Sequence, residues 1–123
     1  MDLGAFSVSL SVSNIEESKI FYRKLGFEIV GGDQSQNWLI LRNSDHTIGL
    51  FKGMFEGNIM TFNPGWDKKC KALESYTDVR ALLKEFEAQG VNIIQQSISD
   101  ESGPASFSIK DPDGNSILID QHV

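Results

Sequence analysis

The stretch of sequence that decides the fold reads NIEESKIFYRKLG and runs from Asn14 to Gly26. Asn14 with Glu17 three residues later forms a capping-box pattern, which predicts that a helix begins here. Gly26 would end that helix in the left-handed conformation. We expect its buried side to carry Ile15, Ser18, Phe21, Tyr22 and Leu25.

The same pattern occurs a second time in the chain. Asp78 stands 64 positions after Asn14, and Gly90 stands 64 positions after Gly26. Asp78 is a helix-capping residue type, and Gly90 supplies the stop. The buried stripe of this second helix is predicted to be Val79, Leu82, Leu83 and Phe86. The chain therefore contains an internal repeat.

Short β-rich segments surround both helices. Residues 6–12 alternate between apolar and serine side chains, which is the period of a strand with one face packed on a helix. Turn clusters separate the segments that follow, and Asp111-Pro112-Asp113-Gly114 predicts a hairpin turn. Further strands are predicted at 27–30, 38–41, 46–51, 91–95, 105–109 and 116–120, and the repeat places one more near Lys71. Each half then reads βαβββ, an α+β class.

Length and composition limit the protein to one domain. The chain has 123 residues, enough to bury a core without disulfides. We divide this domain into module one (residues 5–52), a connecting segment (53–69) and module two (70–121). The connecting segment is long and unusually aromatic, and long loops of that kind are usually functional.

Charge and cysteine content exclude several classes of partner. A net charge of −6 and a pI near 4.8 oppose the phosphate backbone of nucleic acid. No apolar run approaches the length of a membrane span, and the N-terminus lacks the pattern of a signal peptide. The single cysteine, Cys70, cannot form an internal disulfide, so we expect a reducing, cytoplasmic compartment.

The two modules, the segments 12–18 and 21–27, and the string Asp111 to Asn115 together resemble the vicinal oxygen chelate superfamily. That superfamily includes glyoxalase I, bleomycin resistance proteins and extradiol dioxygenases. The resemblance covers essentially the whole chain. It implies that the two βαβββ modules pair in one chain as an incomplete barrel sheet with a concave cavity for ligands. Because this fold carries many activities, it predicts function only weakly.

The resemblance also implies four positions for the ligands of a divalent metal. They correspond here to Ser7, Gly49, Lys71 and Leu118. Glycine and leucine side chains cannot ligate, serine alone is a poor ligand, and lysine would have to lose its proton. We therefore expect neither a metal nor another cofactor. His46 begins a predicted strand and His122 is next to the C-terminus, and a lone histidine at a strand end is more often a surface residue than a ligand.

Other side chains suggest chemistry only weakly. Cys70 lies among Lys68, Lys69 and Lys71, which would lower the pKa of a thiol, but no histidine is near it in sequence. The turn Asn63-Pro64-Gly65 would make Phe62 and Trp66 neighbours. Such an aromatic pair can seal a core edge, form a dimer interface or flank a bound ring.

The hypothesis that follows is a protein of the glyoxalase and bleomycin resistance type that binds a small organic molecule reversibly. Serine hydroxyls would donate hydrogen bonds, aromatic rings would supply stacking surface, and Lys71 would contact an anion. The predicted ligand-binding residues are Ser7, Ser9, Trp38, Gly49, Phe51, Phe62, Trp66, Lys71 and Leu118. The competing class is an enzyme with a divergent metal site or a metal-independent site that uses Cys70 or Glu74. The exposed aromatic segment predicts a homodimer.

Overall fold

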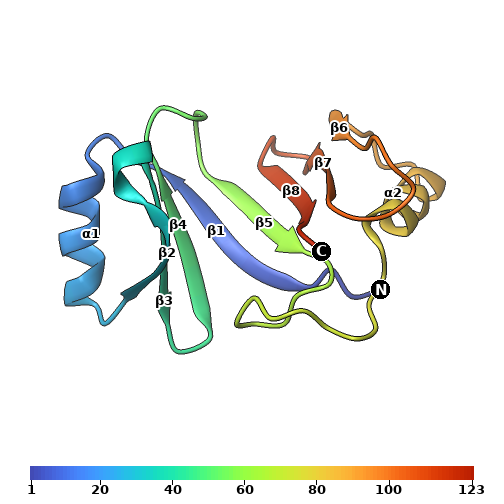
Figure 1. Ribbon diagram of the computed structural model, residues 1–123. Helices are drawn as coiled ribbons and strands as arrows, with labels where there is room; N and C mark the ends of the chain where they lie inside the picture. Colours follow the sequence, from blue (N-terminus) through green and yellow to red (C-terminus); the bar gives the residue numbers. More distant parts are fainter. The chain divides into compact units, whose positions relative to one another are not determined.

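The computed structural model describes all 123 residues and divides them into two units. The N-terminal unit comprises residues 7–59, and the C-terminal unit comprises residues 1–6 and 60–123. The first elements are β1 (Ala5–Ser11), α1 (Ile15–Lys24), β2 (Glu28–Asp33), the short 3-10 helix η1 (Gln34–Gln36), β3 (Trp38–Asn43) and β4 (His46–Phe51). They are followed by β5 (Ile59–Asn63), α2 (Val79–Ala88), β6 (Gln95–Ser97), β7 (Ala105–Lys110) and β8 (Ser116–Gln121) (Figure 1). The predicted α+β class is confirmed.

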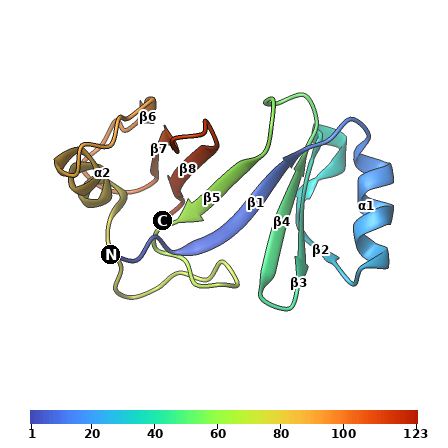
Figure 2. The same ribbon diagram turned by 180° about the vertical axis from the view of Figure 1, so that it is seen from behind.

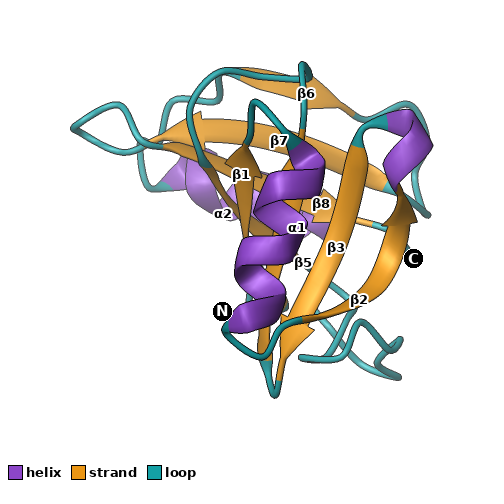
Figure 3. Ribbon diagram, turned by 90° about the vertical axis from the view of Figure 1, so that its left-hand side faces the viewer, coloured by secondary structure: helices purple, strands orange, loops and turns teal.

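The N-terminal unit is a four-stranded sheet with a helix on one face. Its strand order is β2-β3-β4-β1, with β1 parallel to β4 and the other neighbours antiparallel. Asn14 caps α1 as predicted, because its side chain accepts a hydrogen bond from the Glu17 N–H at 3.0 Å. Helix α1 covers the sheet face seen at the front of Figure 3. The core between helix and sheet is Ile15, Leu39, Leu41 and Leu50.

The C-terminal unit repeats this layout. Its strand order is β5-β8-β7-β6, and α2 packs on one face. Asp78 caps α2 by accepting a hydrogen bond from the Arg80 N–H at 2.9 Å. The buried core consists of Val79, Leu82, Leu83, Ala105, Phe107 and Ile119. The helical stripe predicted from the sequence is confirmed, with Phe86 packed at its edge.

The prediction of a strand near Lys71 is wrong. The first strand of the C-terminal unit is β5, Ile59–Asn63, which lies inside the segment that we expected to connect the modules. Residues 64–78 form an irregular loop between β5 and α2, drawn in yellow in Figure 2. The Asp67 carboxylate accepts hydrogen bonds from the Lys69 and Lys71 N–H groups, and Cys70 has a positive φ of 62°. This local turn uses the donors that a strand would need.

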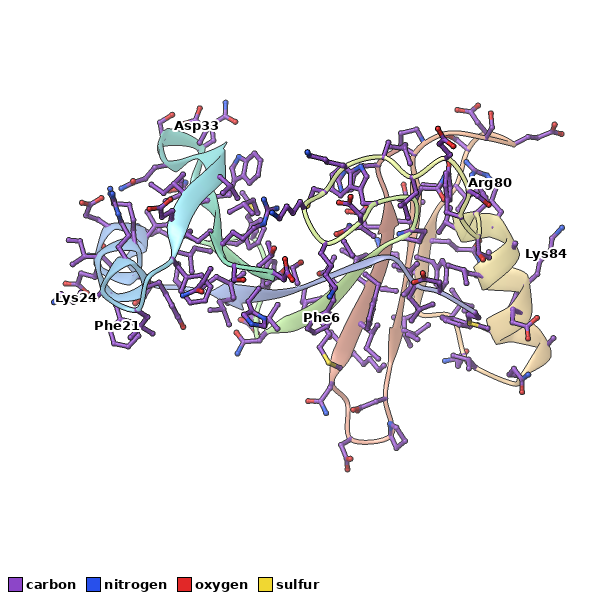
Figure 4. The ribbon with its side chains drawn as sticks, turned by 90° about the horizontal axis from the view of Figure 1, so that it is seen from below. Phe6, Phe21, Lys24, Asp33, Arg80 and Lys84 are labelled. Atoms are coloured by element: carbon purple, nitrogen blue, oxygen red, sulfur yellow. The ribbon has the colours of Figure 1, made fainter.

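The buried side of α1 is narrower than predicted. Phe21 and Leu25 are 55% and 54% exposed, although the helical spacing placed both in the core. Figure 4 shows Phe21 at the surface of α1. Leu25 is the residue that caps the end of the helix, so only Ile15 is fully buried on this short helix and Tyr22 packs beside the core. Strand β6 also differs, since it begins at Gln95 instead of spanning 91–95.

No helix in the structure combines the length and the apolar character that crossing a membrane requires.

Candidate functional site

One face of the N-terminal sheet gathers most of the residues predicted to bind a ligand. We call it the serine face: it comprises the residues of β1, β3 and β4 that alternate with those packed on α1. Leu10 and Val12 pack against the core under α1, so Ser7, Ser9 and Ser11, which alternate with them, point to the opposite side. The serine face consists of Ser7, Ser9, Ser11, Trp38, Ile40, Arg42, Thr47, Gly49 and Phe51.

The strand registers arrange these nine residues in three rows across the sheet. The pairing of β1 with β4 joins Ser7 to Thr47, Ser9 to Gly49, and Ser11 to Phe51. The pairing of β4 with β3 continues the rows to Arg42, Ile40 and Trp38. The first row, Ser7, Thr47 and Arg42, is polar, and we call it the polar row. The last row, Ser11, Phe51 and Trp38, carries two aromatic rings, and we call it the aromatic row.

The rings of the aromatic row form a continuous surface with a third ring from the loop after β4. Trp38 and Phe51 are stacked, with centroids 6.5 Å apart and planes 9° apart. Phe55 lies 5.4 Å from Phe51, and the Ser11 hydroxyl donates a hydrogen bond to the Phe55 carbonyl at 2.9 Å. The serine at the end of β1 therefore holds the loop that carries Phe55.

Gly49 is needed for the position of the Phe51 ring. A Cβ atom at position 49 would overlap the Phe51 ring and would lie 3.4 Å from the Ile40 side chain. The ring therefore lies over the bare backbone of the middle row. Gly49 acts through this close approach, because it has no side chain with which to hold a ligand.

Arg42 is the residue of this face that sequence reasoning missed. It is half-buried, and its Nε donates a hydrogen bond to the Thr47 hydroxyl at 3.2 Å. On the other side, Glu28 of β2 stands opposite Arg42 in the strand register and is exposed. The alternation Trp38, Ile40, Arg42 in β3 is visible in the sequence and would have placed this guanidinium on the same face as Trp38.

The remaining predicted ligand-binding residues lie in the C-terminal unit. Phe62 packs against the core under α2 and lies 5.0 Å from the Phe6 ring, so it seals a core edge. Lys71 is exposed and lies outside any strand, so its prediction as an inward-facing strand residue is wrong. Leu118 of β8 pairs with Ser108 and lies on the face opposite α2.

Trp66 has a partner that the sequence did not indicate. Its ring stacks on His122 with centroids 4.5 Å apart and planes 5° apart. The Nε2 of His122 lies 3.2 Å from an Asp120 carboxylate oxygen. The hydrogen bond to Asp120 raises the pKa of His122, burial opposes that rise, and the negative charge of Asp120 adds to it. The sequence separation of 56 positions between the two rings leaves no local signal for this pair.

The donor groups do not fit the divalent metal that the resemblance implies. At three of the implied positions stand Ser7, Gly49 and Leu118, and the fourth residue, Lys71, lies in the loop. Nowhere in the structure do three or more His, Cys, Asp or Glu side chains form a group that could hold a metal ion. The serine face offers hydroxyls, a guanidinium and aromatic rings, which are groups that bind organic molecules.

Comparisons with known proteins agree with this architecture. The family model described as Glyoxalase/Bleomycin resistance protein/Dioxygenase superfamily matches residues 4–119. A superfamily member from Vibrio splendidus 12B01 has a similar structure, with a TM-score of 0.64, 17% identity, and coverage of 94% of this chain and 97% of that one. Among curated proteins, the sequence search finds no match.

Two structures of enzymes are also similar in fold. Methylmalonyl-CoA epimerase from Mycobacterium tuberculosis has a TM-score of 0.68 at 15% identity, over 100% of this chain and 91% of that one. The Mn(II)-bound glyoxalase from Novosphingobium aromaticivorans has a TM-score of 0.57 at 19% identity, over 97% of this chain and 38% of that one. At such low identity these likenesses establish a shared fold only. They carry no information about the activity of this chain.

Proposed function

The chain belongs to the glyoxalase, bleomycin resistance protein and dioxygenase superfamily, and we propose that it is a member that binds a small organic molecule reversibly on the serine face. We propose further that this binding needs no divalent metal. The Mn(II)-bound relative shows that the fold can hold such an ion, but the residues at the corresponding positions here are poor ligands.

The observation that carries this proposal is the joining of an aromatic surface to a row of polar groups on one sheet face. The stacked Trp38 and Phe51 rings and the adjacent Phe55 supply apolar contact area. The hydroxyls of Ser7 and Thr47 and the guanidinium of Arg42 supply the few hydrogen-bonding groups that orient a ligand. Ser9 lies between these two ends.

Tryptophan fluorescence tests this proposal. A panel of aromatic carboxylates, amines and alcohols is titrated into the parent, into Trp38→Leu and into the matched control Trp66→Leu, each without and then with EDTA. We expect binding to change the emission of Trp38 and to weaken about tenfold to a hundredfold in Trp38→Leu, the typical cost of losing a stacking aromatic. Binding in Trp66→Leu should match the parent. Loss of binding on adding EDTA, or no binding by the parent, would contradict the proposal.

A second candidate function is an enzyme that needs no metal. The pair of Asp120 and His122 favours this candidate. The Asp120 carboxylate faces Nε2 of His122, so the second ring nitrogen, Nδ1, could act as a general base. A substrate of this kind would stack beside Trp66. Turnover that is lost in His122→Gln and kept in Trp38→Leu would favour this candidate over simple binding.

We also propose that the protein is a cytoplasmic homodimer with no nucleic-acid partner. A single cysteine, which cannot form an internal disulfide, supports the compartment, and the acidic charge supports the absence of a nucleic-acid partner. Exposed apolar side chains on α1 and β2 support self-association. These side chains are Ile20, Phe21, Leu25, Ile29 and Val30. Sedimentation should show twice the monomer mass of 13.7 kDa, and Phe21→Glu should reduce it to the monomer.

A further inference from the structure

The outer side of α1 carries a stripe of four exposed residues, which we call the outer stripe. It consists of Glu17, Ile20, Phe21 and Lys24. Their spacing of i, i+3, i+4 and i+7 places them on one side of the helix. On the premise that the protein is a homodimer, as proposed above, we infer that its two copies join through this stripe, with the two α1 helices antiparallel across a two-fold axis.

The outer stripe is separate from the side of α1 that packs on the sheet. Ile15 is buried and Tyr22 packs beside the core, whereas Ile20 and Phe21 are 46% and 55% exposed. The Phe21 ring meets the Tyr22 ring edge-on, with centroids 5.2 Å apart, and this contact holds Phe21 without covering it. Figure 4 shows both Phe21 and Lys24 at the surface of α1. Covering two apolar side chains of this size with a partner stabilises the association.

The two ends of the outer stripe carry opposite charges that the chain itself does not pair. Glu16 and Lys19 form an ion pair at 2.7 Å, and both bond to the Gln34 amide. Glu17 and Lys24 take part in no ion pair within the chain. Glu17 lies in the first turn of α1 and Lys24 in the last, so each charge also stands at the end of the helix that the helix dipole favours.

Antiparallel pairing about a point midway between Ile20 and Phe21 complements the whole stripe. In a two-fold contact, a residue that faces a second residue of the partner is itself faced by that residue in return. Glu17 and Lys24 are equally far from the midpoint, so Glu17 of each copy faces Lys24 of the partner subunit. Ile20 of each copy likewise faces Phe21 of the partner subunit. Two ion pairs then flank an apolar centre, whereas parallel helices would set like charges against each other.

The exposed apolar residues of β2 fit a second copy less well. Ile29 and Val30 lie on this strand, which is at the edge of the sheet. Pairing two β2 strands about their midpoint would set Glu28 opposite Asp33 of the partner subunit at both ends, and two carboxylates opposite each other destabilise a sheet. Pairing through α1 avoids this repulsion. It also leaves the serine face open, because α1 covers the other face of the same sheet.

Exchange of the two charges tests the inference by sedimentation equilibrium. Glu17→Lys and Lys24→Glu are measured alone and as an equimolar mixture, beside matched controls at exposed positions of α2, Glu87→Lys and Lys84→Glu. Each variant of the stripe turns both ion pairs into like-charge contacts, so we expect its dimer Kd to rise about tenfold to a hundredfold. The mixture restores both pairs in a heterodimer, whose Kd should return to within about threefold of the parent. The α2 controls should match the parent, alone and mixed.

Two results would overturn the inference: a mixture that associates as weakly as its components, or single variants that dimerise like the parent. In the second case the proposed homodimer would still stand, formed through another surface. A monomeric parent would contradict both the homodimer and this inference. Neither result bears on ligand binding at the serine face, which the tryptophan titration tests. Circular dichroism of each variant shows whether its helices are kept.

Discussion

The two units make the same connection, from first strand to helix, in two different ways. In the N-terminal unit, β1 ends at Ser11 and α1 begins at Ile15. In the C-terminal unit, β5 ends at Asn63 and α2 begins at Val79. The short connection needs only its capping residue, whereas the long one is held by buried polar side chains. The fold therefore tolerates a long insertion at this point where polar anchors satisfy its backbone.

Gln121 is the central anchor of the long connection. It is 1% exposed, and its amide oxygen accepts a hydrogen bond from the Val79 N–H at 2.8 Å. Its amide nitrogen lies 3.0 Å from an Asp78 oxygen and from the Val123 carbonyl, and 3.1 Å from the Gly103 carbonyl. Burial alone would raise the pKa of Asp78, but hydrogen bonds from Arg80 and Gln121 lower it overall. The side chain thus ties the start of α2 to the end of the chain.

Replacing Gln121 by leucine should have the largest effect. The substitution leaves the buried Val79 N–H without its acceptor and removes one hydrogen bond from the partly exposed Asp78 carboxylate, and we expect a loss of about 2 to 4 kcal/mol in the free energy of unfolding. Urea denaturation measures it. The matched variant in the N-terminal unit is Asn14→Ala, which removes the capping hydrogen bond from the Glu17 N–H and should cost about 1 kcal/mol. Equal losses would show that both connections are held alike.

The contrast between the units also explains which helices and strands could be predicted from the sequence. Both helix starts were predictable because a cap is a local pattern, and Asn14 and Asp78 make the expected bonds. Strand β4 begins and ends at the predicted residues, since turn residues and alternation are local too. Strand β5 was missed because the repeat was taken to hold a constant spacing, while the second unit carries the long loop between strand and helix.

In the candidate site, too, features set by local patterns were predictable and features set by the long loop were not. Alternation along β1 placed Ser7 and Ser9 on the face opposite the helix. Trp38 and Phe51 alternate in the same way along β3 and β4, and the strand registers of the structure put them on that face. Arg42 shares this alternation and was reachable by the same argument. The stack of Trp66 on His122 depends on the path of an irregular loop, and no periodicity in the sequence encodes that path.

An intermediate effect is expected from filling the space above Gly49. In Gly49→Ala the new methyl group overlaps the Phe51 ring, so we expect a loss of about 1 to 3 kcal/mol in stability and displacement of the ring. In a Phe51→Ala background the same substitution should cost less than about 1 kcal/mol, because the overlapping atoms are gone. A double-mutant cycle by urea denaturation measures this coupling. Equal costs in both backgrounds would show that Gly49 does not act through Phe51.

The smallest expected effect concerns the pH response of His122. The Asp120 carboxylate raises the pKa of His122 above its ordinary value of 6.5, so the folded protein holds this proton more tightly than the unfolded chain. The resulting stability is fully present below that value and is lost as the pH rises through the raised pKa. The effect is modest because the side chain is 46% exposed and therefore screened.

Imidazole proton shifts in an NMR titration should follow His122. We expect His122 to titrate above its ordinary value in the parent and to move toward that value in Asp120→Asn. In a Trp38→Phe background, Trp66 is the only indole. Its emission should rise as the pH is raised, with the same midpoint as the His122 proton shift, because a stacked imidazolium quenches indole more strongly than neutral imidazole. A His122 midpoint that stays unchanged in Asp120→Asn would show that the carboxylate does not control this histidine. Independent midpoints for the His122 shift and the Trp66 emission would show that the two rings do not stack in solution.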